Sequence, residues 1–425
     1  MGIMLNEAYP KVVAANRRRR MCFQLCGQDL ETGTPEAKVQ PMERYTVGHA
    51  PDYLSHHEDR YPWVPLTHQG DGLYCAEFDF AGEQRYSVKV RLGDNLFYAG
   101  YAYAVEPDLA ALRPYKGDTH LHTNCSDGWE SPFDTVCAYR AAGYNFIAIT
   151  DHGRYYPSVD TRAEISGLTD AFHIMLGEEV HPKGGSYFHI VSLGARRAVS
   201  PVLEQQHDYV AAQIEAVMAE RDLTALPDPY AAAFRTFVAA EIRRAGGVAV
   251  MAHPFWESGG EYNYQTEEFL YHWRSGDFDA LELLAGCDDT GNGNNLQDIL
   301  WNDLRAEGYR IPVVGASDAH VPRDRCDYDH FNHQFTLVLA TGYDDLTRAI
   351  MEGRAVAVDR RDDKFFRCLG TYRYAKYARH LMREYYGPYT ALAAVHAEAL
   401  AARDKEALSA VEADIAAFDK KFYAV

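Results

Sequence analysis

The stretch from Gly117 to Gly128 reads GDTHLHTNCSDG. Successive side chains of an extended chain point to opposite faces, so His120 and His122 point the same way and can reach one metal ion. Gly128 lets the chain turn back, which brings Asp127 towards the same pocket. This stretch therefore predicts a metal site in the main domain of the protein.

Short, mostly apolar runs surround this stretch and are typical of strands that are buried on both faces. They lie at residues 145–150, 173–176, 188–193, 247–251, 280–284 and 311–314. Helical stretches lie between them, and the first is expected to begin at Pro132, after the capping residue Ser131, and to end at Gly143. Strands that alternate with helices predict a parallel β/α barrel or an open sheet.

Residues of the types that bind metals lie at the ends of these runs, where α/β barrels keep their active sites. They are Asp151, His152, Glu178, Glu179, His189, His253, Asp318 and His320. Buried imidazoles and carboxylates are costly unless they are paired or bind a cation. We therefore expect these side chains to share metal ions.

Six motifs occur in order along residues 118–320: DTHLHTNCSDG, AITDHG, GEEVH, HIVSLG, AHP and GASDAH. They closely resemble the motifs of the PHP (polymerase and histidinol phosphatase) family. A lone HxH or DxH would be weak, but six pieces in order are specific. The resemblance implies a distorted barrel of about seven β/α units that holds up to three metal ions. Members of that family are phosphoesterases, histidinol-phosphate phosphatases or accessory domains of bacterial DNA polymerases.

Carried over position by position, the resemblance implies a trinuclear metal site. His120, His122, Glu179 and Asp318 would hold the first ion, Glu179 would bridge to a second ion held by His189 and His253, and Asp127, His152 and His320 would hold a third. Glu178 remains an alternative to Glu179, because the family usually carries one Glu there. Asp127 stands where some relatives have His, a change that would alter the third metal site.

Three further residues are expected near the metals. Asp151 would orient a ligand imidazole. Arg154 and Arg323 follow His152 and His320 and are candidates for bidentate binding of a substrate anion, although exposed arginines are also common. Mixed histidine and carboxylate ligands suit Zn, Mn or Fe, and two or three such ions would activate water for hydrolysis.

The expected function is hydrolysis of a small phosphate mono- or diester by metal-activated water. One alternative is hydrolysis of a carboxylic ester, carbamate or amide by the same ions, since the motifs are also similar to a branch of the family that includes such hydrolases. Another is a non-catalytic, metal-stabilised module that serves a partner protein. The presence of all nine ligand types argues against the last alternative.

The length of 425 residues and the hydrophobic content of 47% indicate a globular protein of two or three domains. We expect a β-rich, sandwich-like domain at residues 1–113, the barrel at 114–363 and a helical extension at 364–425. Apolar side chains alternate along residues 74–80 and 86–92, which predicts a hairpin with one buried face.

The formal charge of −19 makes nucleic acid a poor default partner, and no run approaches the length of a membrane span. The eight cysteines form no CxxC pair, so free buried thiols are expected. The sequence thus predicts a cytoplasmic protein that acts on a small phosphorylated or ester substrate, and it leaves the oligomeric state open.

Overall fold

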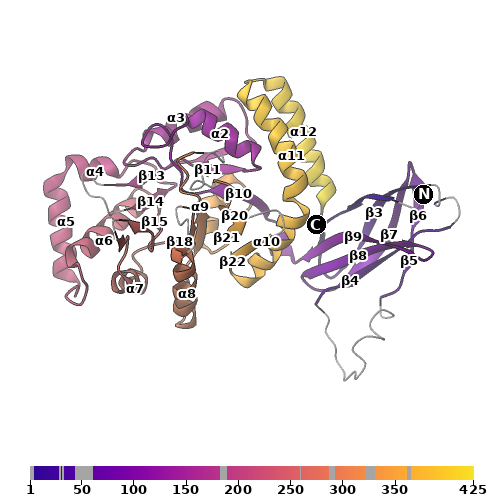
Figure 1. The fold of residues 1–425 in the computed structure, drawn as a ribbon, viewed down its shortest axis with the longest axis horizontal. Coiled ribbons are helices and arrows are strands. Elements are labelled where there is room, and N and C mark those ends of the chain that lie inside the picture. The colour runs from indigo at the N-terminus through magenta and orange to yellow at the C-terminus, as the bar shows by residue number, and fades with distance from the viewer. Residues whose placement is uncertain are drawn as a thin grey trace. The chain divides into compact units, whose positions relative to one another are not determined.

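The computed structural model describes residues 4–27, 30, 33–43, 61–181, 189–258, 260–286, 292–321, 331–360 and 365–425. The chain forms two compact units (Figure 1). The first unit comprises Met1–Leu112, His380–Tyr389 and Ala413–Val425, and the second comprises Arg113–Arg379 and Thr390–Glu412. The three-part division expected from the sequence stays a prediction.

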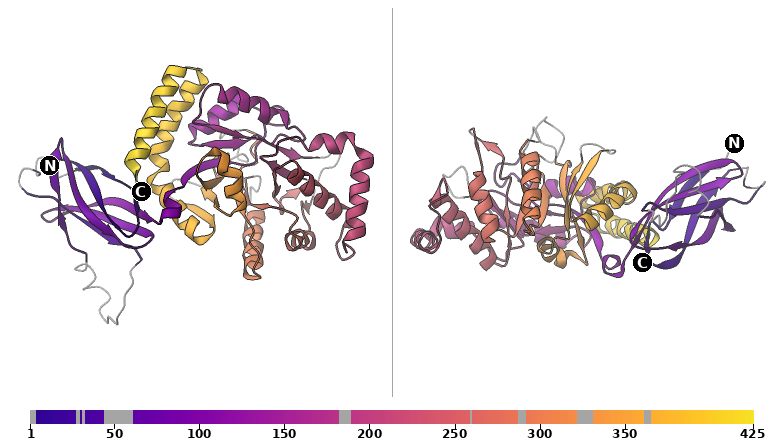
Figure 2. Two further views of the ribbon diagram at one scale, coloured as in Figure 1. Left: turned by 180° about the vertical axis from the view of Figure 1, so that it is seen from behind. Right: turned by 90° about the horizontal axis from the view of Figure 1, so that it is seen from below.

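The first unit contains two sheets, drawn in indigo and purple in Figure 2. One sheet has the order β1 (Met4–Tyr9), β3 (Arg17–Cys26), β7 (Leu73–Phe80) and β6 (Thr67–Gly70). The other has the order β23 (Tyr423–Ala424), β2 (Val12–Ala14), β9 (Asn95–Val105), β8 (Gln84–Leu92), β4 (Glu36–Pro41) and β5 (Val64–Pro65). A single apolar core joins Phe23 and Phe78 of the first sheet with Val88 and Val90 of the second, as in a sandwich.

The predicted hairpin of residues 74–80 and 86–92 is wrong. Both runs are strands, but β7 pairs with β3 and β6, whereas β8 pairs with β4 and β9. The short connection between them therefore crosses from one sheet to the other. Alternating apolar residues determine which face of a strand is buried, but they do not determine which strand supplies its hydrogen bonds.

A disulfide joins Cys22 on β3 to Cys75 on β7, where the two residues lie opposite each other. The expectation of free thiols is wrong for this pair, whereas Cys125, Cys137 and Cys368 are free. Cys287 and Cys326 lie outside the described residues. Disulfides persist mainly in oxidising compartments, so the pair weighs against the cytoplasmic expectation. Among the described helices, none has both the length and the apolar character needed to cross a bilayer.

The second unit is a mixed α/β structure, which confirms the α/β class, whereas the barrel of seven β/α units stays a prediction. One sheet has the order β12 (His173–Met175), β11 (Phe146–Ala148), β10 (Arg113–Asp118), β20 (Gln334–Ala340), β21 (Ala355–Arg360) and β22 (Phe366–Gly370). The other has the order β13 (Gly177–Val180), β14 (Ile190–Leu193), β15 (Val248–Met251), β18 (Ala280–Ala285) and β19 (Val313–Ala316). β11 pairs in parallel with both β10 and β12, and β18 pairs in parallel with both β15 and β19. The remaining pairs of the two sheets are antiparallel. This pairing is more mixed than the seven β/α units that the resemblance implies.

Helices connect these strands. They are α2 (Pro132–Ala141), α3 (Tyr156–Ser166), α4 (Ser200–Gln205), α5 (His207–Glu220), α6 (Pro229–Arg244), α7 (Thr266–Ser275), α8 (Asn292–Ala306) and α9 (Leu346–Met351). The start of α2 is as predicted, because Ser131 Oγ accepts a hydrogen bond from the Asp134 amide. The segments that follow the carboxyl ends of β10, β11, β15 and β19 carry the candidate site.

The C-terminal part of the chain is helical from Tyr372, in α10 (Tyr372–Glu384), α11 (Tyr386–Ala401) and α12 (Lys405–Phe422), and not from residue 364 as expected, because β22 pairs with β21. Within the first unit, β23 pairs in parallel with β2. Within the second unit, the buried Arg140 on α2 donates a hydrogen bond to His396 on α11. Residues near the C-terminus thus complete the packing of each unit.

Candidate metal centre

The nine side chains predicted to bind metal come together in the second unit. They are His120, His122, Asp127, His152, Glu179, His189, His253, Asp318 and His320. They form four groups, and within each group the possible ligand atoms lie within 4.8 Å of one another. Residues almost 200 positions apart in the sequence therefore meet at one end of the strands.

Glu179 lies at the centre of the cluster and is fully buried. Its Oε1 lies 2.6 Å from His189 Nδ1 and 3.5 Å from His253 Nε2, and its Oε2 lies 2.7 Å from His152 Nδ1 and 3.4 Å from Nε2 of both His120 and His122. Each oxygen thus faces its own set of imidazoles. A carboxylate in this position can bridge two cations.

Asp318 completes a second group with His120 and His122. Its Oδ1 lies 3.2 Å from His120 Nε2 and 3.0 Å from His122 Nε2, and those two nitrogens are 3.3 Å apart. Two atoms that each lie about 2.1 Å from one ion, in tetrahedral or octahedral geometry, are about 3.0 to 3.4 Å apart. The spacing of this group therefore fits a single shared ion.

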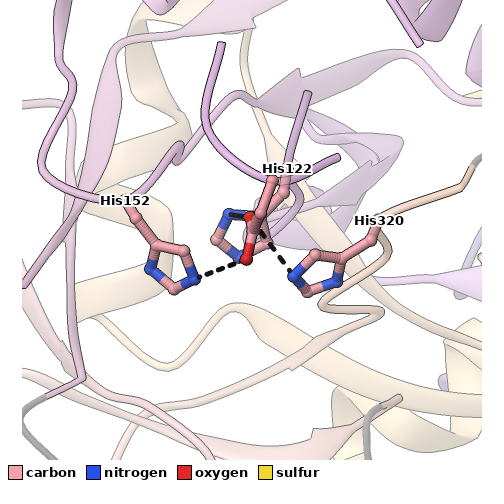
Figure 3. A group of neighbouring side chains, drawn as sticks. His122, His152 and His320 are labelled. Carbon is pink, nitrogen blue, oxygen red and sulfur yellow. Dashed lines mark ion pairs between the residues drawn. The ribbon is translucent and has the colours of Figure 1, made fainter. Parts of the chain in front are cut away.

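Asp127 forms the most exposed group, and its side chain is 55% exposed. Figure 3 shows His122, His152 and His320 turned towards a single carboxylate. This is Asp127, whose oxygens lie 3.4 Å from His152 Nε2, 3.5 Å from His320 Nε2 and 3.8 Å from His122 Nδ1. The group lies at the rim of the cluster, where solvent and substrate can reach it.

Three atoms in the cluster are shielded from water and make no hydrogen bond of good geometry: Glu179 Oε2, His122 Nδ1 and His152 Nδ1, although the first and the last lie 2.7 Å apart. Leaving a buried polar atom unpaired costs about 1–3 kcal/mol. Divalent cations held between the oxygen and the surrounding nitrogens would relieve part of this cost. The donor set therefore fits metal ions.

The backbone is strained at two of these residues. His253 has φ 23° and Asp318 has φ 50°, in the left-handed region that residues other than glycine rarely adopt. Such conformations cost about 1–3 kcal/mol each and cluster at functional sites, where the surrounding structure enforces them. We infer that both residues keep a strained backbone because it places their side chains in the cluster, at a cost in stability.

Charges within the metal-free cluster are strongly coupled. Burial favours the neutral form of His152, but its contacts with Asp127 and Glu179 raise its pKa to about 10. Burial also opposes charge on Glu179, yet the nearby His189 and His120 hold the pKa of this carboxyl well below its usual value. The carboxylates thus attract positive charge, which protons on the imidazoles or bound cations can supply.

The doublet Glu178–Glu179 is resolved by the alternation of β13. Glu179 points into the cluster, while Glu178 points away and accepts hydrogen bonds from the amides of Val199 and Ser200 at the start of α4. Glu178 therefore fixes the entry of α4. It is not among the grouped side chains.

The three other predicted residues have different positions. Asp151 is buried, and its hydrogen bonds within the described residues go to Thr123 and Ser126, each at 2.7 Å, not to an imidazole. It therefore holds the loop that carries Asp127. Arg154 is exposed and, among the described residues, makes no ion pair with the cluster, while Arg323 lies outside the described residues.

Sequence reasoning missed Glu282, a fully buried residue on β18. Its Oε1 lies 3.1 Å from His120 Nδ1, and its Oε2 accepts a hydrogen bond from the His253 amide at 2.7 Å. Glu282 thus fixes the ring orientation of one candidate ligand and the backbone of another. A single charge within the apolar run ALELLA was the signal that could have revealed it.

His181 also lies beside the cluster. The centroid of its ring is 5.1 Å from that of His152 and 5.0 Å from that of His189. Burial, together with these two neighbours, lowers its pKa to about 4. A neutral imidazole therefore stands next to two candidate ligands.

Solved structures that resemble part of this chain include two that are described as metal-dependent phosphoesterases, one of them PHP-like. A two-domain protein from Bacteroides vulgatus, which contains a predicted PHP-like metal-dependent phosphoesterase, is 18% identical over 59% of this chain and 66% of its own, with a TM-score of 0.41. The matched part thus spans slightly less than two thirds of that protein.

Two further structures cover about half of this chain. A candidate metal-dependent phosphoesterase from Bifidobacterium adolescentis is 19% identical over 48% of this chain and 87% of its own, with a TM-score of 0.34. An amidohydrolase from Chromobacterium violaceum, solved with bound sulfate and no metal, is 20% identical over 50% of this chain and 90% of its own, with a TM-score of 0.32. No family model and no curated protein matches the chain.

Proposed function

We propose that the second unit is a metal-dependent hydrolase with a distorted barrel of PHP type, centred on residues 114–363, which cleaves a small phosphate mono- or diester. The observation that carries this proposal is the convergence of nine histidine and carboxylate side chains with which no lysine or arginine of the described residues forms an ion pair. A cluster built only for stability would pair its own charges. This one supplies ligands for cations.

The proposed ligands form three sites. His120, His122, Glu179 and Asp318 hold one ion, Glu179 with His189 and His253 holds a second, and Asp127 with His152 and His320 holds a third. The contacts of Glu179 with both sets of imidazoles support its role as the bridge. Two or three Zn, Mn or Fe ions bound here would lower the pKa of a water molecule and stabilise negative charge on the attacked centre.

The other residues of the site act through these ligands. Glu282 holds the His120 ring in one orientation, and Asp151 fixes the loop that carries Asp127. Because Asp127 is half exposed, the third ion lies closest to solvent, and substrate enters from that side. The candidate contact for a phosphate group is Arg154, which follows His152, or Arg323, which follows His320 in the sequence and lies outside the described residues.

A second candidate is hydrolysis of a carboxylic ester, amide or carbamate. It is favoured by one observation: no lysine or arginine among the described residues forms an ion pair with the nine side chains. Unless Arg154 or Arg323 reaches it, a phosphate at the reacting centre would depend on the metal ions to neutralise its charge, whereas an uncharged ester makes no such demand.

The two candidates are separated by turnover of p-nitrophenyl phosphate, bis-p-nitrophenyl phosphate and p-nitrophenyl acetate with added Mn or Zn. We expect hydrolysis of a phosphate ester that is lost on chelation, restored by metal and absent in His120→Ala, with Glu178→Gln as the folded control. Turnover of the acetate alone would favour the second candidate. A protein that binds metal but turns over none of the three would instead support a non-catalytic module.

A further inference from the structure

The second unit contains a cavity of about 630 Å³ beside the first residues of β19 and β21. Its lining includes Trp301 and Arg305 of α8, Tyr309 and Arg310 after that helix, Gly353 before β21, and Tyr374 of α10. Ligand pockets in proteins have volumes of roughly 300–1,000 Å³. The cavity therefore has the size of a small-molecule site.

This cavity is separate from the metal cluster. Val313, the first residue of β19, lines the cavity, whereas Asp318 follows the other end of the same strand. Five residues of extended chain span about 15 Å. A molecule in the cavity would therefore not touch the candidate metal ligands, and its binding does not depend on the proposed hydrolase activity.

Positive charge without a partner distinguishes the cavity. The Arg305 guanidinium lies 4.4 Å from the centre of the Trp301 ring. Within the described part of the chain neither Arg305 nor Arg310 forms an ion pair with a carboxylate, although the protein has 61 acidic residues and only 42 lysines and arginines. Glu352 also lines the cavity, but its carboxylate bonds to Arg354 at 2.9 Å. Two cations are thus available to an anion from outside.

Aromatic side chains also line the cavity and could contact the ring of a bound molecule. Tyr309 and Tyr374 are partly buried, and among the described residues their hydroxyl groups form no hydrogen bond. Both tyrosines line the cavity together with Arg305 and Arg310, and the Arg305 guanidinium lies over the buried Trp301 ring. Aromatic faces bind planar rings, and arginine binds carboxylate, sulfonate or phosphate groups in bidentate fashion.

A neighbouring cavity of similar size shows the contrast. It has a volume of about 660 Å³ and is lined by Arg162, His173 and Arg348, together with Asp170, Asp344 and Asp345. There Arg348 already pairs with Asp345 at 2.6 Å. Three aspartates face two arginines in that cavity, so its lining does not favour an anion.

We propose that the cavity between α8, β21 and α10 binds a small anion that carries an aromatic ring. The anionic group binds Arg305 and Arg310, and the ring packs against Tyr309, Tyr374 and the Trp301–Arg305 stack. An aromatic carboxylate, sulfonate or phosphate meets this description. The site would be a second ligand site of the protein, distinct from the metal cluster.

The test is calorimetric titration of the full chain with naphthalene-2-sulfonate, after treatment with a chelator so that no metal can attract the anion. We expect saturable binding to one site. Methanesulfonate lacks the ring and 2-naphthalenemethanol lacks the charge, so each should bind at least about tenfold more weakly. The double variant Arg305→Gln/Arg310→Gln should weaken binding of naphthalene-2-sulfonate by about tenfold or more, because charge-assisted hydrogen bonds are lost.

Two controls keep this test decisive. Arg162→Gln, in the neighbouring cavity, should bind the probe as the wild type does, and Tyr309→Ala provides a second variant if the double variant does not fold. Equal affinity of the double variant and the wild type, equal affinity for methanesulfonate, or absence of binding at millimolar probe would each overturn the proposal. None of these outcomes would affect the hydrolase proposal, which is tested on the metal-loaded protein.

Discussion

Two buried polar clusters of the second unit solve the same physical problem in opposite ways. The first, which we call the closed network, consists of Arg221, Arg235, Glu268, His272 and Asp277. Arg235 donates to Glu268 at 2.5 Å, Arg221 donates to Asp277 at 2.8 Å, and the His272 ring lies between the two acids, 2.9 Å from Asp277 and 3.4 Å from Glu268. Each carboxylate of the closed network has an arginine.

The metal cluster has no such balance. Its three carboxylates face six imidazoles, and no arginine or lysine of the described residues pairs with it. Three of its buried atoms make no hydrogen bond of good geometry, and two of its residues have strained backbones. The comparison teaches that burial of charge alone does not mark a functional site. What marks it is charge that the protein leaves for something else to balance.

The largest expected effect lies in the closed network. Replacing Glu268 with Gln leaves Arg235, which is only 3% exposed, without its anion. Breaking a buried ion pair costs about 3–5 kcal/mol of unfolding free energy. Chemical denaturation measures this loss, and Glu307→Gln, which breaks an exposed pair with Arg274, should cost less than about 1 kcal/mol. Metal content should stay that of the wild type. If Glu268→Gln unfolds at the same denaturant concentration as the wild type, Glu268 does not balance the buried charge of Arg235.

The metal cluster should respond in activity more than in stability. Glu179→Gln removes the bridging negative charge, so kcat/KM should fall by at least about a hundredfold, or about 2.7 kcal/mol of transition-state stabilisation. Glu178→Gln keeps an oxygen that can accept from the amides at the start of α4, and its kcat/KM should stay within a few-fold of the wild type. Steady-state kinetics of both variants with saturating metal decides the matter. Equal losses for the two residues would contradict the assignment of Glu179.

An intermediate effect is expected where the protein orients a ligand without being one. Glu282→Gln keeps the size of the side chain but removes the charge that faces His120 Nδ1. Loss of such an orienting partner typically lowers metal affinity or activity by 10–100-fold. Competition with a chelating dye measures the metal affinity, with Glu178→Gln as the control. An affinity equal to that of the wild type would show that Glu282 is only a structural residue.

The smallest effect concerns a histidine outside the metal cluster. Burial, with a contribution from Arg162, lowers the pKa of His173 to about 4, and its ring stacks on Tyr343. The unfolded histidine has a pKa of about 6.5, so it takes up a proton first as the pH falls. The neutral His173 ring therefore stabilises the folded protein fully above about pH 6.5, and this contribution is lost between about pH 6.5 and 4.

His173→Phe keeps the stacking and removes the proton, so its stability should depend less on pH. Between pH 6.5 and pH 5 the wild type should lose about 1 kcal/mol more than the variant in urea denaturation. Parallel pH profiles for the two proteins would contradict the lowered pKa. His152 behaves in the opposite way, because its acidic neighbours raise its pKa to about 10 in the absence of metal.

The candidate ligands could be predicted from the sequence because their types and spacing repeat at strand ends. All nine gather, and even the choice of Glu179 over Glu178 agrees with the side-chain directions of β13. Glu282 was missed because it lies within a strand, where an apolar run hides a single charge. Its role depends on which strand lies beside the loop of His120, and spacing along the chain does not contain that information.

The arrangement of the strands was harder to predict for the same reason. The disulfide between Cys22 and Cys75 joins residues 53 positions apart, and β23 pairs with β2 from the other end of the chain. Alternation identified β7 and β8 as strands but paired them wrongly. Local pattern determines the buried face of an element, whereas its partner is chosen by packing of the whole unit.

The central claim is that the nine gathered side chains bind divalent cations. The most direct measurement is elemental analysis of the purified full chain, with the metal content of Asp318→Ala and Glu268→Gln determined in parallel. We expect two or three divalent ions per chain in the wild type, fewer in Asp318→Ala, and the wild-type number in Glu268→Gln. A wild-type protein that holds no divalent ion after incubation with Zn, Mn or Fe, or an Asp318→Ala variant that holds as many ions as the wild type, would contradict this claim.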